Sequence, residues 1–353
     1  MSKKRTNDIP EPRPLVEVRR GSITESRHRG HIAAVDTEGQ IVAHLGVPGV
    51  LTYMRSSAKP FQSLPLVASG AADRFGFTTQ EIAIACASHN GEPIHTETVA
   101  AMLRKIGMPE SALKCGVHEP FSAEEAARLR ERGEKPGVLH NNCSGKHAGM
   151  LALALHLGAP TDTYDQPDNP VQLMIARTIE LFSDVPLEDI AVGVDGCGAP
   201  VFGVTVRAMA LMYARFVQPP EDWPNETRKA AERIVSAMIS HPEIIGGREE
   251  RLDTVLMRAT RGRVVSKVGA EGVYTAGVLP SERWPRGLGL AFKIEDGEDR
   301  RARPTVVIEA LRQLGVLEGA ALDELAPYES FTIRNHRGDA VGEVRANFEL
   351  ELS

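Results

Sequence analysis

The chain has 353 residues with 42% hydrophobic and 25% charged side chains, a net charge of −6 at pH 7 and an isoelectric point of about 6.0. These are values of a globular protein, and the acidic balance argues against nucleic acid or an anionic membrane as the main partner. No apolar run approaches the roughly 18 residues that span a bilayer, and no apolar signal-peptide core follows the basic start, so we expect a cytoplasmic protein.

The first elements are a disordered lead and a hairpin. Residues 1–14 are polar and proline-rich, which predicts no regular structure. Residues 31–36 and 40–45 are short β-type runs with a three-residue turn between them, which predicts an antiparallel hairpin. Residues 51–66 then combine apolar flanks with a polar centre, a pattern that favours a buried helix around Ser56.

The middle of the chain is mostly helical, and its end is mixed. The expected helices of the middle are 79–87, 94–106, 123–132, 147–157 and 170–182. The expected later elements are strands 190–194, 203–206, 263–268 and 287–294, helices 226–240 and 303–315, and a hairpin of 331–334 with 341–345. This order predicts an α/β (α+β) fold, in which an antiparallel sheet is flanked by helices. We expect one catalytic domain over 15–353, with the sheet built from about 15–65 and 190–353 and a helical region, about 66–190, inserted between them.

A serine and a lysine lie three residues apart in the stretch that we expect to be helical. On a helix this spacing puts Ser56 and Lys59 on one face, where the amine can take the proton of the hydroxyl. That arrangement makes serine a nucleophile without histidine and indicates acyl transfer. The spacing alone is weak evidence, because Ser111 and Lys114 repeat it and a polar helix face would look the same.

A second polar cluster follows an apolar run that ends at Cys86. Ser88, His89 and Asn90 are consecutive there, and they place a second hydroxyl beside an imidazole and an amide. The alternative interpretation is a helix C-terminus, with Asn90 or Gly91 in the left-handed conformation. The two interpretations are compatible.

The four cysteines are too few and too scattered for a disulfide framework, which leaves buried thiols or a metal site. Cys143 begins an apolar helix, and the positive potential of a helix N-terminus lowers the pKa of a thiol. Together with Cys197 in Asp195-Gly196-Cys197 it provides two sulfur ligands from distant segments. Their spacing matches no standard zinc finger.

The order of the motifs is more specific than any one of them. Lys267 closes a β-type run before small residues, so that Ser-x-x-Lys, Ser-x-Asn and Lys-x-Gly occur in turn. This is the motif order of the penicillin-recognising enzymes and the serine glutaminases. More closely, residues from about 20 to 348 resemble the L-asparaginase family of the rhizobial, inducible type. The shared stretches are Arg55 to Pro60, Cys86 to His89, Asn142 to His147, Asp195 to Cys197 and Lys267 to Ala270.

The resemblance implies a site, a cofactor and an assembly. It implies two serine–lysine pairs, Ser56 with Lys59 and Ser88 with Lys267. It implies a Zn²⁺ ion held by Cys143, Lys146 and Cys197, with Asp195 beside it, and lysine must lose its proton to bind. The family carries a further cysteine where this chain has Asp253, which leaves Asp253 as a polar partner for zinc-bound water or the substrate amine. The implied fold is of the serine β-lactamase and glutaminase kind, and the implied assembly is a homodimer.

The expected activity is therefore hydrolysis of L-asparagine to L-aspartate and ammonia through an acyl-enzyme. Ser56 is the expected nucleophile with Lys59 as its base, and Ser88 with Lys267 is the rival assignment. Arg55, His89 and Asn90 are expected to contact the substrate or to support these groups. The alternative functions are a serine-dependent glutaminase, a β-lactam-type amidohydrolase, or a non-catalytic, zinc-stabilised binding protein.

Overall fold

The computed structural model describes residues 11–248 and 251–353. The predicted disordered lead falls mainly on residues 1–10, which lie outside the described residues. Strand β1 (Arg13–Arg20) already includes the last two residues of that predicted lead. In the described part of the chain, no helix is both long and apolar enough to cross a membrane.

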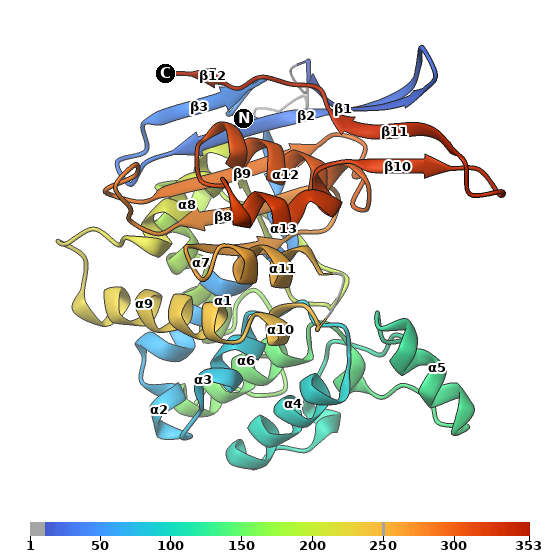
Figure 1. The fold of residues 1–353 in the computed structure, drawn as a ribbon. Helices are drawn as coiled ribbons and strands as arrows, with labels where there is room; N and C mark the ends of the chain where they lie inside the picture. The colour runs from blue at the N-terminus through green and yellow to red at the C-terminus, as the bar shows by residue number, and fades with distance from the viewer. Residues whose placement is uncertain (1–10, 249–250) are drawn as a thin grey trace, which may run out of the picture.

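A nine-stranded antiparallel sheet forms the layer at the top of Figure 1. Its main strand order is β10-β11-β1-β2-β9-β8-β7, and β3 also pairs with β2 while β12 pairs with β3. The other strands of this sheet are β2 (Ile23–Val35), β3 (Ile41–Leu45), β7 (Val264–Val268), β8 (Val273–Val278), β9 (Leu288–Ile294), β10 (Phe331–Arg334), β11 (Ala340–Ala346) and β12 (Glu351–Leu352). Strands from both ends of the chain therefore share one sheet, as predicted.

The sheet is buried on both faces because apolar residues occupy both sides of β2. Side chains alternate along a strand, so Ile32 and Ala34 enter one hydrophobic core while Ala33 and Val35 enter the other. Helix α8 (Val206–Val217) packs against β2, β8 and β9 in the core that holds Ala33. Helices α12 (Ala302–Gln313) and α13 (Ala320–Glu329) cover the opposite face.

The remaining helices gather below the sheet (Figure 1). They are α1 (Lys59–Ala68), α2 (Ala71–Arg74), α3 (Thr79–Ala85), α4 (Pro93–Ile106), α5 (Ala123–Glu131), α6 (Ser144–Leu157), α7 (Pro170–Ser183), α9 (Asn225–Ser240), α10 (Pro242–Ile245) and α11 (Leu252–Ala259), with 3-10 turns η1 (Arg55–Ala58), η2 (Glu110–Ala112), η3 (Val138–His140) and η4 (Leu187–Asp189). A small sheet of order β4-β6-β5, made of β4 (Leu51–Tyr53), β5 (Ala191–Val194) and β6 (Pro200–Thr205), joins the two regions.

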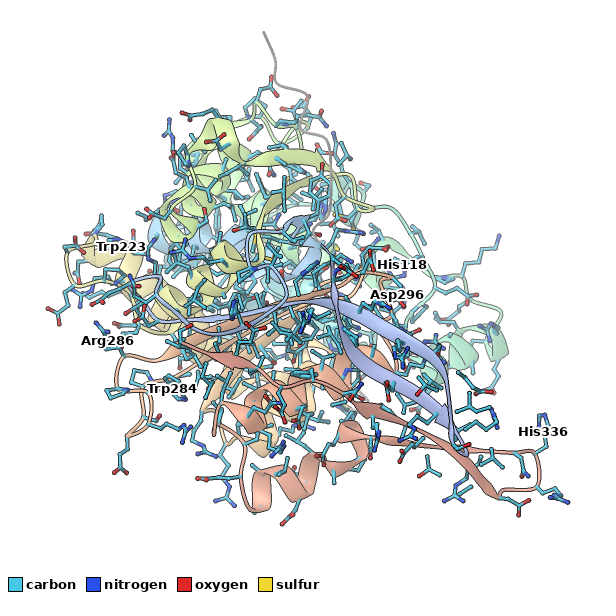
Figure 2. The ribbon with its side chains drawn as sticks, turned by 90° about the horizontal axis from the view of Figure 1, so that it is seen from above. His118, Trp223, Trp284, Arg286, Asp296 and His336 are labelled. Atoms are coloured by element: carbon cyan, nitrogen blue, oxygen red, sulfur yellow. The ribbon has the colours of Figure 1, made fainter. Side chains whose placement is uncertain are left out.

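Two hairpins, β1–β2 and β10–β11, extend from the body of the molecule (Figure 1). The β10–β11 hairpin reaches outward beside β1 and β2 in Figure 1, and Figure 2 shows His336 at its tip. β1 links the two hairpins because it pairs with both β2 and β11.

The predicted mixed fold with an antiparallel sheet and a helical middle is confirmed. Two local predictions were wrong. Residues 51–53 form strand β4 rather than the start of a helix, because they pair with β6. Helix α8 begins at Val206, although the sequence pattern predicts a strand over 203–206. The Thr205 hydroxyl accepts a hydrogen bond from the N–H of Ala208 and starts the helix there.

Candidate active site

Three distant segments bring two lysines onto one serine. Lys59 begins α1, Ser88 lies in the loop after α3, and Lys267 lies on the edge strand β7. The Nζ atoms of Lys59 and Lys267 lie 3.0 and 2.9 Å from Ser88 Oγ. All three residues are buried, at 1%, 3% and 0% exposure for Lys59, Ser88 and Lys267. The structure thus places the predicted pair of Ser88 and Lys267 in contact and adds Lys59 to it.

Ser56 stands one helical turn from Lys59 but does not share this contact. It lies half-buried in η1, directly before α1. Within the described residues no hydrogen bond joins Ser56 Oγ to Lys59 Nζ. The Lys59 amine instead donates to the carbonyl oxygens of Ala87 at 2.5 Å and Asn142 at 3.1 Å, besides Ser88. Of the two serines, Ser56 is the one that solvent reaches.

The backbone beside Ser56 is held in an unusual conformation. Arg55 has φ of +52°, a left-handed value that costs a non-glycine residue about 1 kcal/mol or more. The Arg55 side chain donates to Asp195 at 3.0 Å, and the Tyr213 hydroxyl donates to the carbonyl of Ser57 at 2.8 Å. Gly269 passes so close that a Cβ there would lie 2.7 Å from the carbonyl oxygen of Met54. The absence of a side chain at Gly269 therefore allows this turn to lie against the end of β7.

Burial sets the protonation of the two lysines. Desolvation lowers the pKa of Lys267 to about 7, partly opposed by the Asp253 carboxylate and assisted by the Lys59 charge. Desolvation also lowers the pKa of Lys59, while the Cys143 sulfur raises it. Lys267 can consequently gain or lose a proton near neutral pH. An ordinary surface lysine cannot do so.

Asp253 and Arg251 fix this centre from α11 and the residue before it. The Asp253 carboxylate accepts from the N–H of Val268 at 3.1 Å and lies 3.7 Å from Lys267 Nζ. The Arg251 guanidinium donates to the carbonyl of Ser88 at 2.8 Å and to Asn90 Oδ1 at 2.5 Å. No sequence pattern assigned a role to Arg251. Its position two residues before Asp253, in a stretch that matches the family motif, could have indicated one.

His89 lies in a place where it supports the loop rather than acting as a base. Its Nδ1 accepts from the N–H of Gly91 at 3.1 Å, and its Nε2 lies 3.0 Å from the Ser144 hydroxyl. Burial keeps its pKa well below the usual range. Gly91 has φ of +75°, so the left-handed residue expected near this loop is Gly91 and not Asn90.

The predicted metal ligands meet in a second buried cluster. Lys146 Nζ lies 3.0 Å from Cys197 Sγ, and the Cys143 thiol, which donates to Asn142 Oδ1 at 3.5 Å, lies near enough to interact with both. Asp195 lies beside them and is held by Arg55. Interaction with Cys143 and the charge of Lys146 lower the pKa of Cys197 to about 5 against the effect of burial, which favours the thiolate form of this sulfur.

The expectation for Cys143 was wrong. Although Cys143 caps the N-terminus of α6, its interaction with Cys197 and its burial raise its pKa to about 12. The cysteine with the lowered pKa is Cys197. The neighbouring sulfur and burial thus outweigh the potential of the helix end.

The cluster fits a soft divalent ion in the identity of its donors. Two sulfurs and one amine converge, and thiolates are preferred zinc ligands. Lys146 is protonated in this arrangement, since the sulfurs raise its pKa despite burial, so binding requires it to release a proton. In residues 11–248 and 251–353 no group of three His, Cys, Asp or Glu side chains is arranged to hold a metal.

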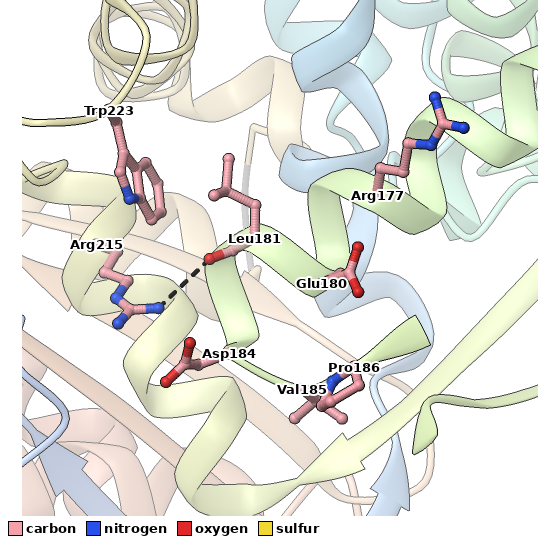
Figure 3. A pocket seen from close by; sticks show the side chains of 8 residues that line it. All are labelled: Arg177, Glu180, Leu181, Asp184, Val185, Pro186, Arg215 and Trp223. Carbon is pink, nitrogen blue, oxygen red and sulfur yellow. Dashed lines mark hydrogen bonds between the residues drawn. The ribbon is translucent and has the colours of Figure 1, made fainter. Parts of the chain in front are cut away.

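Several cavities lie in the described structure, and two of them bear on the position of the site. One of about 610 Å³ lies at the end of α7, where Arg215 contacts the carbonyl oxygen of Leu181 near Trp223 (Figure 3). None of the predicted site residues lines it. Another, of about 530 Å³, is lined by Arg251, Asp253 and Val268 among others, and it therefore borders the centre at Ser88 and Lys267.

The sequence matches the family described as L-asparaginase II over residues 16–346. No curated protein matches it significantly. The similar solved structures include a probable glutaminase from Bacillus subtilis complexed with 6-diazo-5-oxo-L-norleucine, at 15% identity and a TM-score of 0.37 over 81% of this chain and 84% of that one. They also include a B. subtilis glutaminase in covalent complex with 5-oxo-L-norleucine, at 13% identity and a TM-score of 0.39 over 81% and 88%. At these TM-scores the likeness supports no conclusion about the substrate.

Proposed function

The chain belongs to the L-asparaginase II family and is an amidohydrolase, and we propose that it hydrolyses L-asparagine to L-aspartate and ammonia through a serine–lysine acyl-enzyme. The observation that carries the mechanism is the buried contact of Ser88 with Lys59 and Lys267. Two charged amines around one buried hydroxyl would repel each other in a medium of low polarity, which favours the neutral form of at least one of them, and buried lysines with lowered pKa values are typical of sites that transfer protons.

In the proposed first step, Ser56 Oγ attacks the side-chain amide carbon of the substrate and its proton passes to neutral Lys59. The accessibility of Ser56 supports this role, since the substrate must reach the nucleophile and Ser88 is only 3% exposed. The oxyanion that forms would be met by a backbone N–H at the start of η1, that of Ser56. The Lys59 side chain must turn from its carbonyl partners toward Ser56 for this step.

In the next steps Ser88 relays the proton. The tetrahedral intermediate breaks its carbon–nitrogen bond as the leaving nitrogen receives the proton, and ammonia departs. Ser88 contacts both lysines, so it can pass a proton between Lys59 and Lys267, and Lys267 must be neutral to accept one. Water then attacks the acyl-ester by the same proton path in reverse, which releases L-aspartate and restores Ser56.

Alanine at each serine tests this assignment. Ser56→Ala is expected to abolish the acyl adduct, seen by mass spectrometry after acid quench, and to reduce turnover by about 10⁴-fold or more. Ser88→Ala is expected to slow turnover while the adduct still forms. If the Ser56→Ala protein keeps wild-type turnover and Ser88→Ala forms no adduct, the rival assignment with Ser88 as nucleophile is correct.

Ammonia release from L-asparagine, L-glutamine and a β-lactam, measured side by side with β-lactam opening read by absorbance, tests the substrate. We expect L-asparagine to have the highest kcat/KM. A higher kcat/KM for L-glutamine or for the β-lactam would replace the proposed substrate and leave the mechanism standing. No turnover of any of them would favour the non-catalytic binding protein.

We further propose that Cys143, Lys146 and Cys197 hold a zinc ion, on the basis of the donor set described above. Such an ion would fix the loops on which Asp195 and Cys143 lie and supply positive charge beside Arg55. Metal analysis of purified protein by mass spectrometry, with Cys143→Ser as the comparison, tests this. The homodimer is likewise a proposal, which rests on the family resemblance, and light scattering tests it. The cytoplasmic location, which we expect from the sequence pattern, is a proposal as well.

A further inference from the structure

A cavity at the edge of the large sheet adjoins the serine–lysine centre. It has a volume of about 530 Å³, and we call it the Arg251–Arg300 pocket. The lining residues that matter are Arg251, Asp253, Val268, Arg300, Arg303 and Phe331. They come from the start of α11, the end of β7, the first turn of α12 with the loop before it, and β10. A free amino acid is well within this volume.

The pocket is joined to the proposed reaction centre by two residues that belong to both. Arg251 lines the pocket and donates to the carbonyl of Ser88 at 2.8 Å. Asp253 lines it as well and lies 3.7 Å from Lys267 Nζ. A ligand on Arg251 would therefore lie within a few ångströms of the loop that carries Ser88.

Among the described residues, the pocket wall carries more positive than negative charge, with three arginines, Arg251, Arg300 and Arg303, against the two carboxylates of Asp253 and Asp299. Arg303 pairs with Asp299 at 2.7 Å, and Asp253 pairs with Lys267. Within the described residues, neither Arg251 nor Arg300 forms an ion pair with a carboxylate. The Arg251 side chain has only neutral acceptors, in Ser88 and Asn90. Two arginines without anionic partners at the wall of one pocket are suited to a carboxylate ligand.

Unsatisfied polar atoms at the same wall point to a ligand of both charges. Arg303 Nε, a donor, and Asp253 Oδ1, an acceptor, are buried without a hydrogen-bond partner. Asp253 is only 1% exposed, so water does not satisfy that oxygen at the surface. Buried polar groups are left unpaired rarely in folded proteins, and an orphaned donor and acceptor on one pocket match a zwitterion.

We propose that the Arg251–Arg300 pocket binds the α-carboxylate of the substrate, between the guanidinium groups of Arg251 and Arg300. This inference rests on the proposed function and specifies its substrate class as free α-amino acids rather than asparagine within a peptide chain. Arg251 fixes the carboxylate relative to Ser88, and Arg300, which is exposed, closes the pocket from solvent. Phe331, at the start of β10, contributes apolar surface to the same pocket.

The test uses Arg300→Gln, because Arg251 also holds the Ser88 loop and its replacement would confuse two effects. Two analogues divide the substrate: succinamate lacks the α-amine, and 3-aminopropanamide lacks the α-carboxylate. We expect the variant to raise KM for L-asparagine and for succinamate roughly tenfold, because it loses one charge-assisted hydrogen bond to the carboxylate. For 3-aminopropanamide, which has no carboxylate, we expect no change in kcat/KM. The matched control is Arg301→Gln, which removes the same charge one residue away and does not line the pocket.

Binding of L-aspartate by calorimetry separates this inference from the proposed function. Loss of L-aspartate binding in Arg300→Gln but not in Arg301→Gln supports the pocket, even for a wild-type protein that releases no ammonia from L-asparagine. The absence of ammonia release from L-asparagine by the wild-type protein would overturn the proposed function but not the pocket. Equal KM and equal L-aspartate affinity in wild type and Arg300→Gln would overturn the pocket, whichever amide the protein hydrolyses.

Discussion

Replacing Asp253 by asparagine should move the pH dependence of the reaction toward acid. The Asp253 carboxylate lies 3.7 Å from Lys267 Nζ, and both side chains are buried, at 1% and 0% exposure. It stabilises the charged form of Lys267 and thus holds the pKa of this lysine up to about 7 against desolvation. The amide of asparagine retains the shape and the hydrogen bond from Val268 but removes the charge.

The size of the effect follows from the distance. At an effective dielectric constant of about 20, two unit charges at this separation interact by about 4 kcal/mol. Since one pH unit corresponds to about 1.4 kcal/mol, the charge is worth up to about three pH units. Relaxation of the site reduces this, and we expect the pKa of Lys267 to fall by about two pH units or more. The sign follows from the mechanism, because neutral Lys267 accepts the proton.

The assay is kcat for ammonia release at saturating substrate, measured from pH 4.5 to 9. The acid limb of the wild type should have its midpoint near pH 7, and that of Asp253→Asn should lie about two pH units lower or more. Glu309→Gln is the control, because it removes another largely buried carboxylate that pairs with Arg312 away from the site. An acid limb that stays in place in Asp253→Asn would refute the role of neutral Lys267.

Three further predictions concern the supports of the site. Cys197→Ser removes the sulfur beside buried Lys146, so the zinc content of the purified protein should fall to below a tenth of the wild-type value. A wild-type zinc content in the variant would contradict the proposed ligand set. Gly145→Ala would force a Cβ against the carbonyl oxygen of Ile84 and should lower the free energy of unfolding by about 2 kcal/mol. In the control Gly149→Ala the nearest contact of the new Cβ would be 3.3 Å, so the loss of stability should be smaller. Equal urea midpoints for the two variants would disprove this. Tyr213→Phe removes the hydrogen bond to the Ser57 carbonyl. It should lower the free energy of unfolding, measured in urea, by about 1 kcal/mol and reduce kcat several-fold. An unchanged kcat would show that this bond does not position Ser56.

The sequence was a good guide to elements with strong periodicity. Helices such as α4 and α7, and the β2–β3 hairpin, have apolar residues at regular spacing bounded by capping or turn residues. It failed where pairing with a distant strand decided the outcome. β4 is only Leu51–Tyr53, too short to signal a strand, and its partner β6 comes about 150 residues later in the chain. β8 was not predicted, although it fills the sheet between β7 and β9.

For the candidate site, the sequence supplied the residue types but not their contacts. The spacing of Ser56 and Lys59 predicts a shared face, which a local turn provides. It could not show that Lys59 reaches Ser88, because that contact depends on how α1 and the loop after α3 pack. The role of Arg251 and the inversion of pKa between Cys143 and Cys197 were hidden for the same reason. Each depends on a neighbour from another segment of the chain.

The long strand β2 has a consequence for how the molecule folds. It pairs with β1 and β3 nearby in the sequence, but also with β9, which is formed by Leu288–Ile294. During synthesis the β9 edge of β2 must wait until about four-fifths of the chain has been made, and contacts of such sequence separation fold slowly. Until then a largely apolar strand edge stays unpaired and open to association with other chains. Substitutions in β9 should therefore have a larger effect on the yield of correctly refolded protein than on the free energy of unfolding of the molecules that do fold.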